Sequence, residues 1–380
     1  MMYKSYRFRI YPDASQQKQI AENFGCNRFV YNQLVEKQPE KGLISRNLQK
    51  EMIEQFKREQ PWLQSVNQSI VFHTFDNFNH NLLRSRELNR RLRFKSNLGR
   101  QSFSLSNFKN SVLVGPRSVQ VKSVGSLKAR VTPRPEGQIL SITIIKMASG
   151  RFYMSVLTRQ PDINCQPIAL KEKMSCIGLD MGIRHFLTMS DGTQIENPKY
   201  FEEDLQRLQH MQKDLARKVR GSSNYFKQCR RIARQHERIA CRRNAFLHKL
   251  STEIVRKFDI IAVEKLGISD MLQEKHLSLR ISDASWRRFI NMLAYKANWY
   301  GKQLIQIDRY YPSSKTCCRC HYKLEEMPLY IRDWQCPQCE TQHDRDTNAA
   351  INIMTQGVKI YIKSNPAHRQ KLIPVLSDRR

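Results

Sequence analysis

Polar and apolar residues alternate over the first dozen positions of the chain. Tyr6, Phe8 and Ile10 fall on one side of this pattern, and Arg7 and Arg9 fall on the other. An alternation with a period of two residues is typical of a strand that buries one face. We therefore expect the chain to open on a half-buried strand whose outer face is basic.

The apolar spacing becomes helical from residue 14 to about residue 92, and Pro61 separates the second predicted helix from the third. The third helix runs into a group of basic residues, namely Arg84, Arg86, Arg90, Arg91, Arg93 and Lys95. Only Glu87 opposes them. A charge run is usually a solvated face, but one so one-sided in a basic chain favours contact with phosphates. We expect these six residues, with Arg7 and Arg9, to contact a nucleic-acid backbone.

Short strand patterns return between residues 102 and 159, separated by glycine and proline turns. Several short strands at this spacing predict a small antiparallel barrel. The opening strand is expected to join it, which would make the helical block an insertion. The polar residues 161–173 are interpreted as a linker.

A different order of elements is predicted after residue 174. The expected elements are a strand over 176–180, a hairpin partner over 186–189, helices over 205–219 and 226–258, a strand over 260–264, a helix over 286–299, a strand over 304–307 and a helix that begins near Asp346. This mixed α/β order is the plan of a ribonuclease H-like fold.

Three carboxylates occupy the ends of these elements. Asp180 closes the first strand, Glu264 closes a later one, and Asp346 lies at the start of the last helix. Each is ordinary alone, and Glu264 fits an exposed strand end equally well. Together they could hold two divalent ions about 3.5–4 Å apart for phosphodiester hydrolysis, and magnesium suits an all-oxygen ligand set. Asp344 is a second candidate for the third acid, or a helix cap.

Two Cys-x-x-Cys pairs precede the last helix and are separated by fifteen residues: Cys317 and Cys320, then Cys336 and Cys339. This double spacing predicts a structural zinc site in which four thiolates close a tetrahedron. Cys318 is interpreted as a spectator. The remaining cysteines are Cys26, Cys165, Cys176, Cys229 and Cys241, spread singly as reduced thiols usually are.

The charge of the chain points to a polyanionic partner. Its 380 residues, 40% of them hydrophobic, suffice for two or three domains. Lysine and arginine number 65 against 34 acidic residues, which gives a net charge of +31. Nucleic acid is the first candidate for the partner. No stretch approaches eighteen apolar residues and no signal peptide opens the sequence, so we expect no membrane partner and a cytoplasmic location.

Several sequence segments together resemble the TnpB family of transposon-associated RNA-guided nucleases, which is related to the type V CRISPR effectors. The matching segments are Tyr6-Arg7-Phe8-Arg9-Ile10-Tyr11-Pro12, Phe24-Gly25-Cys26-Asn27-Arg28-Phe29-Val30-Tyr31-Asn32, Gly178-Leu179-Asp180-Met181-Gly182, Val263-Glu264, Pro312-Ser313-Ser314-Lys315-Thr316-Cys317, Trp334-Gln335-Cys336-Pro337 and His343-Asp344-Arg345-Asp346-Thr347-Asn348-Ala349-Ala350. The resemblance places the acids of a RuvC-like magnesium site on Asp180, Glu264 and Asp346, and a zinc ribbon on the four cysteines.

The resemblance also implies a domain plan. The ranges are a wedge β-barrel over 1–13 and 101–165, a helical recognition domain over 14–100, a RuvC-like nuclease domain over 174–311 and 341–362, and a zinc ribbon over 312–340. The tail over 363–380 is basic and rich in Pro, Arg and Lys, and this composition indicates a disordered segment or an arm that contacts RNA. His321 and Glu340 depart from the family, which usually has glycine after each cysteine pair. Glycine suits a turn with positive φ, so zinc would be held less comfortably, or His321 would compete as a ligand.

The function implied is that of an RNA-guided DNA endonuclease. A guide RNA from the transposon end would pair with one strand of double-stranded target DNA, while the protein would bind a short flanking motif. Two alternatives remain open: an RNA-guided DNA-binding repressor without nuclease activity, and a transposase that joins strands itself. The sequence leaves the oligomeric state undecided.

Overall fold

The computed structural model describes residues 1–39, 42–107, 111–161, 174–267, 278–328, 330–369 and 372. The chain divides into two compact units. One comprises Met1–Asp162 with Val219–Arg234, and the other comprises Ile163–Lys218 with Gln235–Arg380. Nearly all of the predicted linker, together with Cys165, lies outside the described residues.

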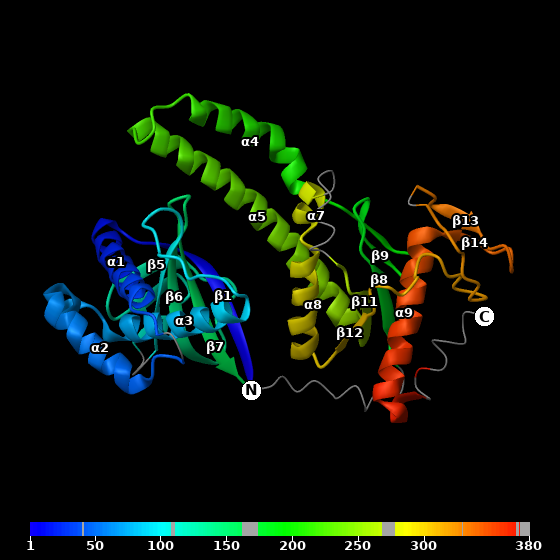
Figure 1. Cartoon of the computed structure of the whole chain (residues 1–380), viewed down its shortest axis with the longest axis horizontal. Coiled ribbons are helices and arrows are strands. Elements are labelled where there is room, and N and C mark those ends of the chain that lie inside the picture. The colour runs from blue at the N-terminus through cyan, green and yellow to red at the C-terminus, as the bar shows by residue number, and fades with distance from the viewer. Residues whose placement is uncertain are drawn as a thin grey trace. The chain divides into compact units, whose positions relative to one another are not determined.

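The first unit is built on a seven-stranded antiparallel sheet. Its strands are β1 (Met2–Tyr11), β2 (Gln101–Ser106), β3 (Val112–Val114), β4 (Ser118–Val121), β5 (Gly125–Arg130), β6 (Gln138–Lys146) and β7 (Phe152–Gln160). Their order is β2-β6-β7-β1-β5-β4-β3, so the opening strand does join the sheet, between β7 and β5. The predicted small antiparallel barrel is present as a sheet that curls into a half-barrel (Figure 1).

Three helices come between β1 and β2 in the chain, namely α1 (Ala14–Glu36), α2 (Arg46–Glu59) and α3 (Gln68–Glu87). Asp13 and Gln16 form a capping box that starts α1, and Pro61 begins a short 3₁₀ turn, Pro61–Ser65, after α2. Ile20 of α1 and Ile70 of α3 pack into the core of the sheet. The apolar stripes predicted from the sequence thus attach the helices to the half-barrel.

The second unit contains a five-stranded mixed sheet. Its strands are β8 (Cys176–Asp180), β9 (His185–Met189), β10 (Gln194–Glu196), β11 (Ile260–Glu264) and β12 (Gln303–Ile307), in the order β10-β9-β8-β11-β12. β8, β9 and β10 pair antiparallel, whereas β11 pairs parallel with both β8 and β12. The parallel centre aligns the carboxyl ends of β8 and β11.

Helices cover both faces of this sheet (Figure 1). α5 (Ser223–Lys257), α7 (Ser278–Ala284) and α8 (Trp286–Trp299) contribute to one face, and α9 (Arg345–Ser364) covers the other. α4 (Tyr200–Ala216) precedes α5 in the chain. Leu179 and Val263 share a buried cluster with Leu250 of α5 and Leu293 of α8. Ala262, one residue before Val263, instead packs with Ile353 of α9 on the other face.

Two glycines allow α9 to lie directly on the strands. A Cβ atom on Gly178 of β8 would collide with the main-chain oxygen of Ala350, and one on Gly357 of α9 would collide with Ala262 of β11. The helix therefore crosses the sheet at closer range than ordinary side chains permit. This contact brings the first turn of α9 to the carboxyl ends of β8 and β11.

A small element precedes α9. It contains β13 (Asp333–Gln335) and β14 (Gln342–Asp344), an antiparallel pair. The tail was predicted to begin at residue 363, but α9 extends to Ser364, so the first two residues of that range belong to the helix. A 3₁₀ turn, Pro366–His368, follows. Residues 370–371 and 373–380 of that tail lie outside the described residues. Over the described ranges, every helix is too short or too polar to cross a bilayer.

Candidate active site and cysteine cluster

Asp180 and Glu264 occupy equivalent positions on neighbouring strands. Ala262 of β11 pairs with Gly178 of β8, and each acid lies two residues further along its own strand. Side chains two residues apart share a face, and adjacent strands lie about 4.8 Å apart. Both carboxylates therefore project side by side from the face of the sheet that α9 covers.

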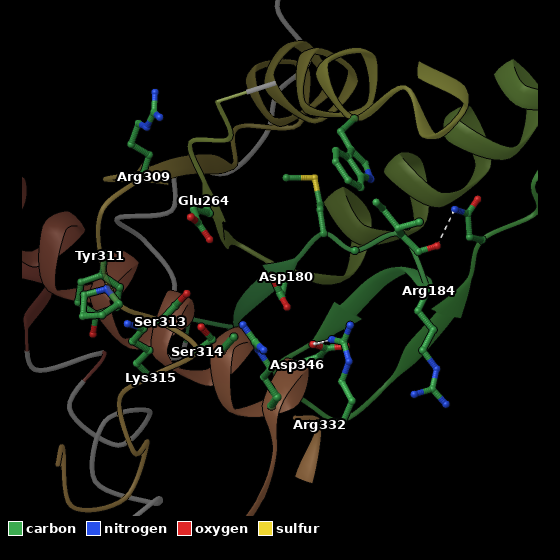
Figure 2. A pocket seen from close by; sticks show the side chains of 18 of the residues that line it. Asp180, Arg184, Glu264, Arg309, Tyr311, Ser313, Ser314, Lys315, Arg332 and Asp346 are labelled. Atoms are coloured by element: carbon green, nitrogen blue, oxygen red, sulfur yellow. Dashed lines mark hydrogen bonds and ion pairs between the residues drawn. The ribbon is translucent and has the colours of Figure 1, made fainter. Parts of the chain in front are cut away.

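Asp346 supplies the third carboxylate from the first turn of α9. Figure 2 shows the side chains of Asp180, Glu264 and Asp346 gathered around one cavity. Asp344 instead caps α9, because its side chain accepts a hydrogen bond from the main-chain N–H of Thr347 over 2.7 Å. Of the two interpretations that the sequence left open for Asp344, the structure supports the helix cap.

The electrostatics of this cluster favour a cation. Burial, together with the neighbouring charges of Asp346 and Glu264, raises the pKa of Asp180 to about 7, against opposing contributions from Arg345 and Arg332. Burial also raises the pKa of Glu264 to about 7. Carboxylates that repel one another in this way are stabilised by a divalent ion. The donor set is all oxygen, and it fits magnesium.

The cavity around the acids has a volume of about 1040 Å³. Its basic lining residues outside the acid cluster include Arg184, Lys199, Arg309, Lys315, Lys323 and Arg332. A cavity with acids at its base and cations along its walls suits an anionic polymer, because the cations attract the phosphates that the acids alone would repel.

Arg332 is a functional candidate that the sequence analysis missed. Its guanidinium donates to a carboxylate oxygen of Asp346 over 2.9 Å (Figure 2). Its main-chain oxygen accepts from the N–H of Arg345, which anchors it beside α9. An arginine fourteen residues before an acid forms no recognisable pattern, so only the position of Arg332 inside the predicted zinc element could have suggested it.

Two asparagines of α9 hold the loop that lines the cavity. Asn348 and Asn352 both donate to the main-chain oxygens of Ser313 and Thr316, and Asn352 does so over 2.8 and 2.6 Å. Both side chains are buried. The loop that carries Ser314 and Lys315 is therefore fixed to the same helix that carries Asp346.

The four predicted zinc ligands converge. One sulfur from each of Cys317, Cys320, Cys336 and Cys339 lies within 4.8 Å of every other. The Sγ atoms of Cys317 and Cys339 are 3.6 Å apart, and those of Cys320 and Cys336 are 3.5 Å apart. A tetrahedron with Zn–S bonds of about 2.3 Å has edges of about 3.8 Å. The cluster thus has the dimensions of a structural zinc site.

The residues that replace glycine in the two cysteine turns do adopt the strained backbone expected of them. His321 has φ of 64° and Glu340 has φ of 57°. Despite these two substitutions for glycine, the four cysteine sulfurs lie within 4.8 Å of one another. Among the described residues, the group of mutually close ligand atoms around the four cysteines does not include a nitrogen of His321.

The predicted nucleic-acid contacts fall into different environments. The guanidinium of Arg7 lies over the ring of Tyr153, and that of Arg9 lies over Tyr11. Arg86 donates to main-chain oxygens of Pro39 and Gly42, and the Lys95 ammonium lies 3.9 Å from the ring centre of Tyr31. Burial lowers the pKa of Lys95 to about 8. The exposed members of the group are Arg7, Arg84, Arg86, Arg90, Arg91 and Arg93, whereas Arg9 and Lys95 are half-buried. Their contact with nucleic acid stays a prediction.

Three family models match separate parts of the chain. Residues 286–353 match "Cas12f1-like, TNB domain", residues 155–275 match "Probable transposase", and residues 1–41 match "Helix-turn-helix domain". The last region forms the strand β1 followed by the helix α1 over its described part.

Curated relatives match over longer stretches. A protein of Streptomyces pristinaespiralis named "Putative RNA-guided DNA endonuclease" is 33% identical over 93% of this chain and 89% of its own length. The Escherichia coli protein "Putative RNA-guided DNA endonuclease InsQ" is 29% identical over 62% of this chain and 60% of its own length. A solved chain from "Cryo-EM structure of the Cas12f1-sgRNA-target DNA complex" covers 93% of this chain and 99% of its own length, at 14% identity and a TM-score of 0.36. The chain therefore belongs to the TnpB family, also known as OrfB of IS605, and carries a Cas12f1-like TNB domain.

Proposed function

We propose that this chain is an RNA-guided DNA endonuclease of an IS605-family transposon, which hydrolyses phosphodiester bonds at Asp180, Glu264 and Asp346. The convergence of these three acids in one cavity carries the proposal. The strand order β10-β9-β8-β11-β12, three antiparallel strands followed by two parallel ones, supports an RNase H-like, RuvC-like nuclease domain. The carboxyl ends of β8 and β11 would then form its catalytic edge.

The acidic and basic residues of the cavity would have different roles in the reaction. Magnesium bound by the three carboxylates would supply Lewis-acid chemistry for the hydrolysis. Arg332 holds Asp346, and Lys315 reaches the cavity from the loop fixed by Asn348 and Asn352. These cations orient and neutralise the phosphate backbone at the acids.

The partners proposed are a guide RNA from the transposon end and double-stranded target DNA. The net charge of +31 supports two polyanions, because each requires its own positive surface. The names of the relatives in Streptomyces and Escherichia coli support the same reaction. We further propose that the half-barrel is the wedge domain (1–13 and 101–165), that residues 14–100 form the recognition domain, and that 312–340 is a structural zinc ribbon inserted in the nuclease domain (174–311 and 341–362).

One assay separates this function from its two alternatives. The full chain is purified with its RNA, the RNA is sequenced, and a DNA duplex that matches the guide region is incubated with the complex and magnesium. The proposal predicts cleaved, unjoined DNA. Binding without cleavage would indicate an RNA-guided repressor, and joined products would indicate a transposase that transfers strands.

A further inference from the structure

Four consecutive residues connect the cysteine cluster to the acid cluster. His343 lies at the end that faces the cysteines, with its Nε2 atom 3.1 Å from Sγ of Cys317. Asp344 caps α9, and Arg345 donates to the main-chain oxygen of Pro328 over 2.8 Å. Asp346 completes the acid cluster. Because His343 and Asp346 are only three residues apart in the chain, a displacement of the His343 backbone would also displace Asp346.

The ring of His343 is held in place. It is 7% exposed, and it packs against the ring of Trp334, its cross-strand partner, with centres 4.7 Å apart. Its Nδ1 atom faces Sγ of Cys318 at 3.9 Å. This fixed orientation directs Nε2 at Cys317 alone among the four cysteines, as far as the described contacts show.

With zinc bound, this contact would be an outer-sphere hydrogen bond. Cys317 would then be a thiolate, which accepts but cannot donate, so the proton between the two atoms would belong to Nε2. The nitrogens of His343 do not belong to the group of mutually close metal-binding atoms among the described residues. The residue is thus placed to support a ligand and not to replace one. Outer-sphere partners of this kind typically change metal affinity by about 10–100-fold.

We propose that His343 is a positioning residue that couples the two sites. Its Nε2–H donates to the thiolate of Cys317, strengthens zinc retention, and holds β14 so that Asp346 faces Asp180 at the start of α9. The first part rests on the cysteine cluster alone. The second part, the effect on Asp346, rests on the proposed function.

Three variants of the full chain test the hydrogen bond. His343→Phe keeps an aromatic ring against Trp334 but removes both ring nitrogens. His343→Gln can place an amide N–H near the position of Nε2, whereas His343→Asn reaches only the position of Nδ1. The zinc-loaded proteins are mixed with a chromogenic chelator, and the rate of zinc transfer is measured. Manganese binding is then followed by the electron paramagnetic resonance of free Mn²⁺.

The proposal predicts zinc transfer roughly 10-fold or more faster for His343→Phe and His343→Asn than for the native protein, and a near-native rate for His343→Gln. It also predicts weaker manganese binding by His343→Phe and His343→Asn. Equal zinc transfer by all four proteins would overturn it, as would equal zinc transfer by His343→Gln and His343→Asn. If His343→Phe fails to fold, the comparison of His343→Gln with His343→Asn decides. Failure of all three to fold would indicate packing alone and would also overturn it. If the native protein binds no manganese, that result contradicts the proposed function. The zinc transfer rates would still test the proposed hydrogen bond between His343 and Cys317.

Discussion

Arg332 and Asp346 form an ion pair of 2.9 Å at the edge of the acid cluster. The arginine comes from the segment that joins the two cysteine pairs, and the acid comes from the first turn of α9. The positive charge of Arg332 also lowers the pKa of Asp180, against the burial and the two acids that raise it. Arg332 thus makes the cluster easier to ionise, so that Asp180 loses its proton at a lower pH.

Removing this arginine should move cation binding to higher pH without unfolding the protein. In Arg332→Ala, the pKa of Asp180 rises further, so the pH at which manganese binding is half-maximal moves upward. The unfolding free energy should change by less than about 1 kcal/mol, because the pair is partly exposed. Manganese titrations across pH measure the shift. Lys249→Ala removes an exposed lysine of α5 and should leave the profile unchanged; an unchanged profile in Arg332→Ala would refute the electrostatic role.

The raised pKa values of Asp180 and Glu264 predict a stability that depends on pH. Both are about 7 in the folded chain, against ordinary values of 3.8 and 4.5. The folded state therefore holds more protons than the unfolded state between these limits. Their contribution to stability is fully present below about pH 4 and is lost as the pH rises through about 7.

This dependence can be measured by chemical denaturation of the zinc-loaded protein in magnesium-free buffer at several pH values. The double variant Asp180→Asn with Glu264→Gln should flatten the curve over the interval from about pH 5 to about pH 8. Added magnesium should restore stability to the native protein at high pH, since it replaces the protons. A native curve as flat as that of the double variant would contradict the raised pKa values.

The local pattern of the sequence was sufficient to predict much of this site. β8 and β11 were predicted because each is a short apolar run that ends in a charged residue, and the cysteine pairs because their spacing is dictated by zinc. Strand β1 was predicted from the alternation of apolar and basic residues, and the structure confirms it. Sequence periodicity could not show that Arg332 contacts the acid cluster or that His343 contacts the cysteine cluster, because these contacts depend on how β13, β14 and α9 pack in space.

Other elements were missed for a different physical reason. β2 and β10 depend on their neighbours in the sheet more than on their own short polar sequences. In the basic group before β2, Arg86 is tied to main-chain oxygens and Lys95 to Tyr31. Charge alone could not distinguish basic side chains that bind other groups of the chain, such as Arg86 and Lys95, from exposed arginines such as Arg90.

The close approach of α9 to the sheet predicts a severe effect at Gly178. In Gly178→Ala, the new methyl group meets the main-chain oxygen of Ala350, which cannot move without displacing the helix. The unfolding free energy should fall by about 1–3 kcal/mol or more. Gly25→Ala is the matched control, since no atom lies within 4 Å of its Cβ position and alanine favours a helix. Denaturant unfolding measures both. Equal stability of the two variants would contradict the packing described for α9.

The zinc assignment predicts that replacing one of the four cysteines abolishes zinc binding and unfolds the segment around the cluster. Cys336→Ser should lose most of its zinc and leave the 317–339 segment open to limited proteolysis, because a structural zinc site contributes about 10–16 kcal/mol to folding. Zinc content is measured by atomic emission. Cys241→Ser changes an exposed cysteine outside the cluster and should retain the metal. Full zinc content and native protease resistance in Cys336→Ser would show that the assignment is wrong.

The most direct test of the three-acid nuclease site compares two neighbouring aspartates. Asparagine caps helices as well as aspartate does, so Asp344→Asn should keep α9 and cleave guide-matched DNA at close to the native rate. Asp346→Asn should retain its RNA but cleave about a thousandfold more slowly or worse, because loss of several kcal/mol of metal-assisted stabilisation corresponds to that factor. Cleavage rates of the two RNA-bound variants at saturating magnesium decide the matter. Native cleavage by Asp346→Asn, or equal loss in both variants, would contradict a shared catalytic site of Asp180, Glu264 and Asp346.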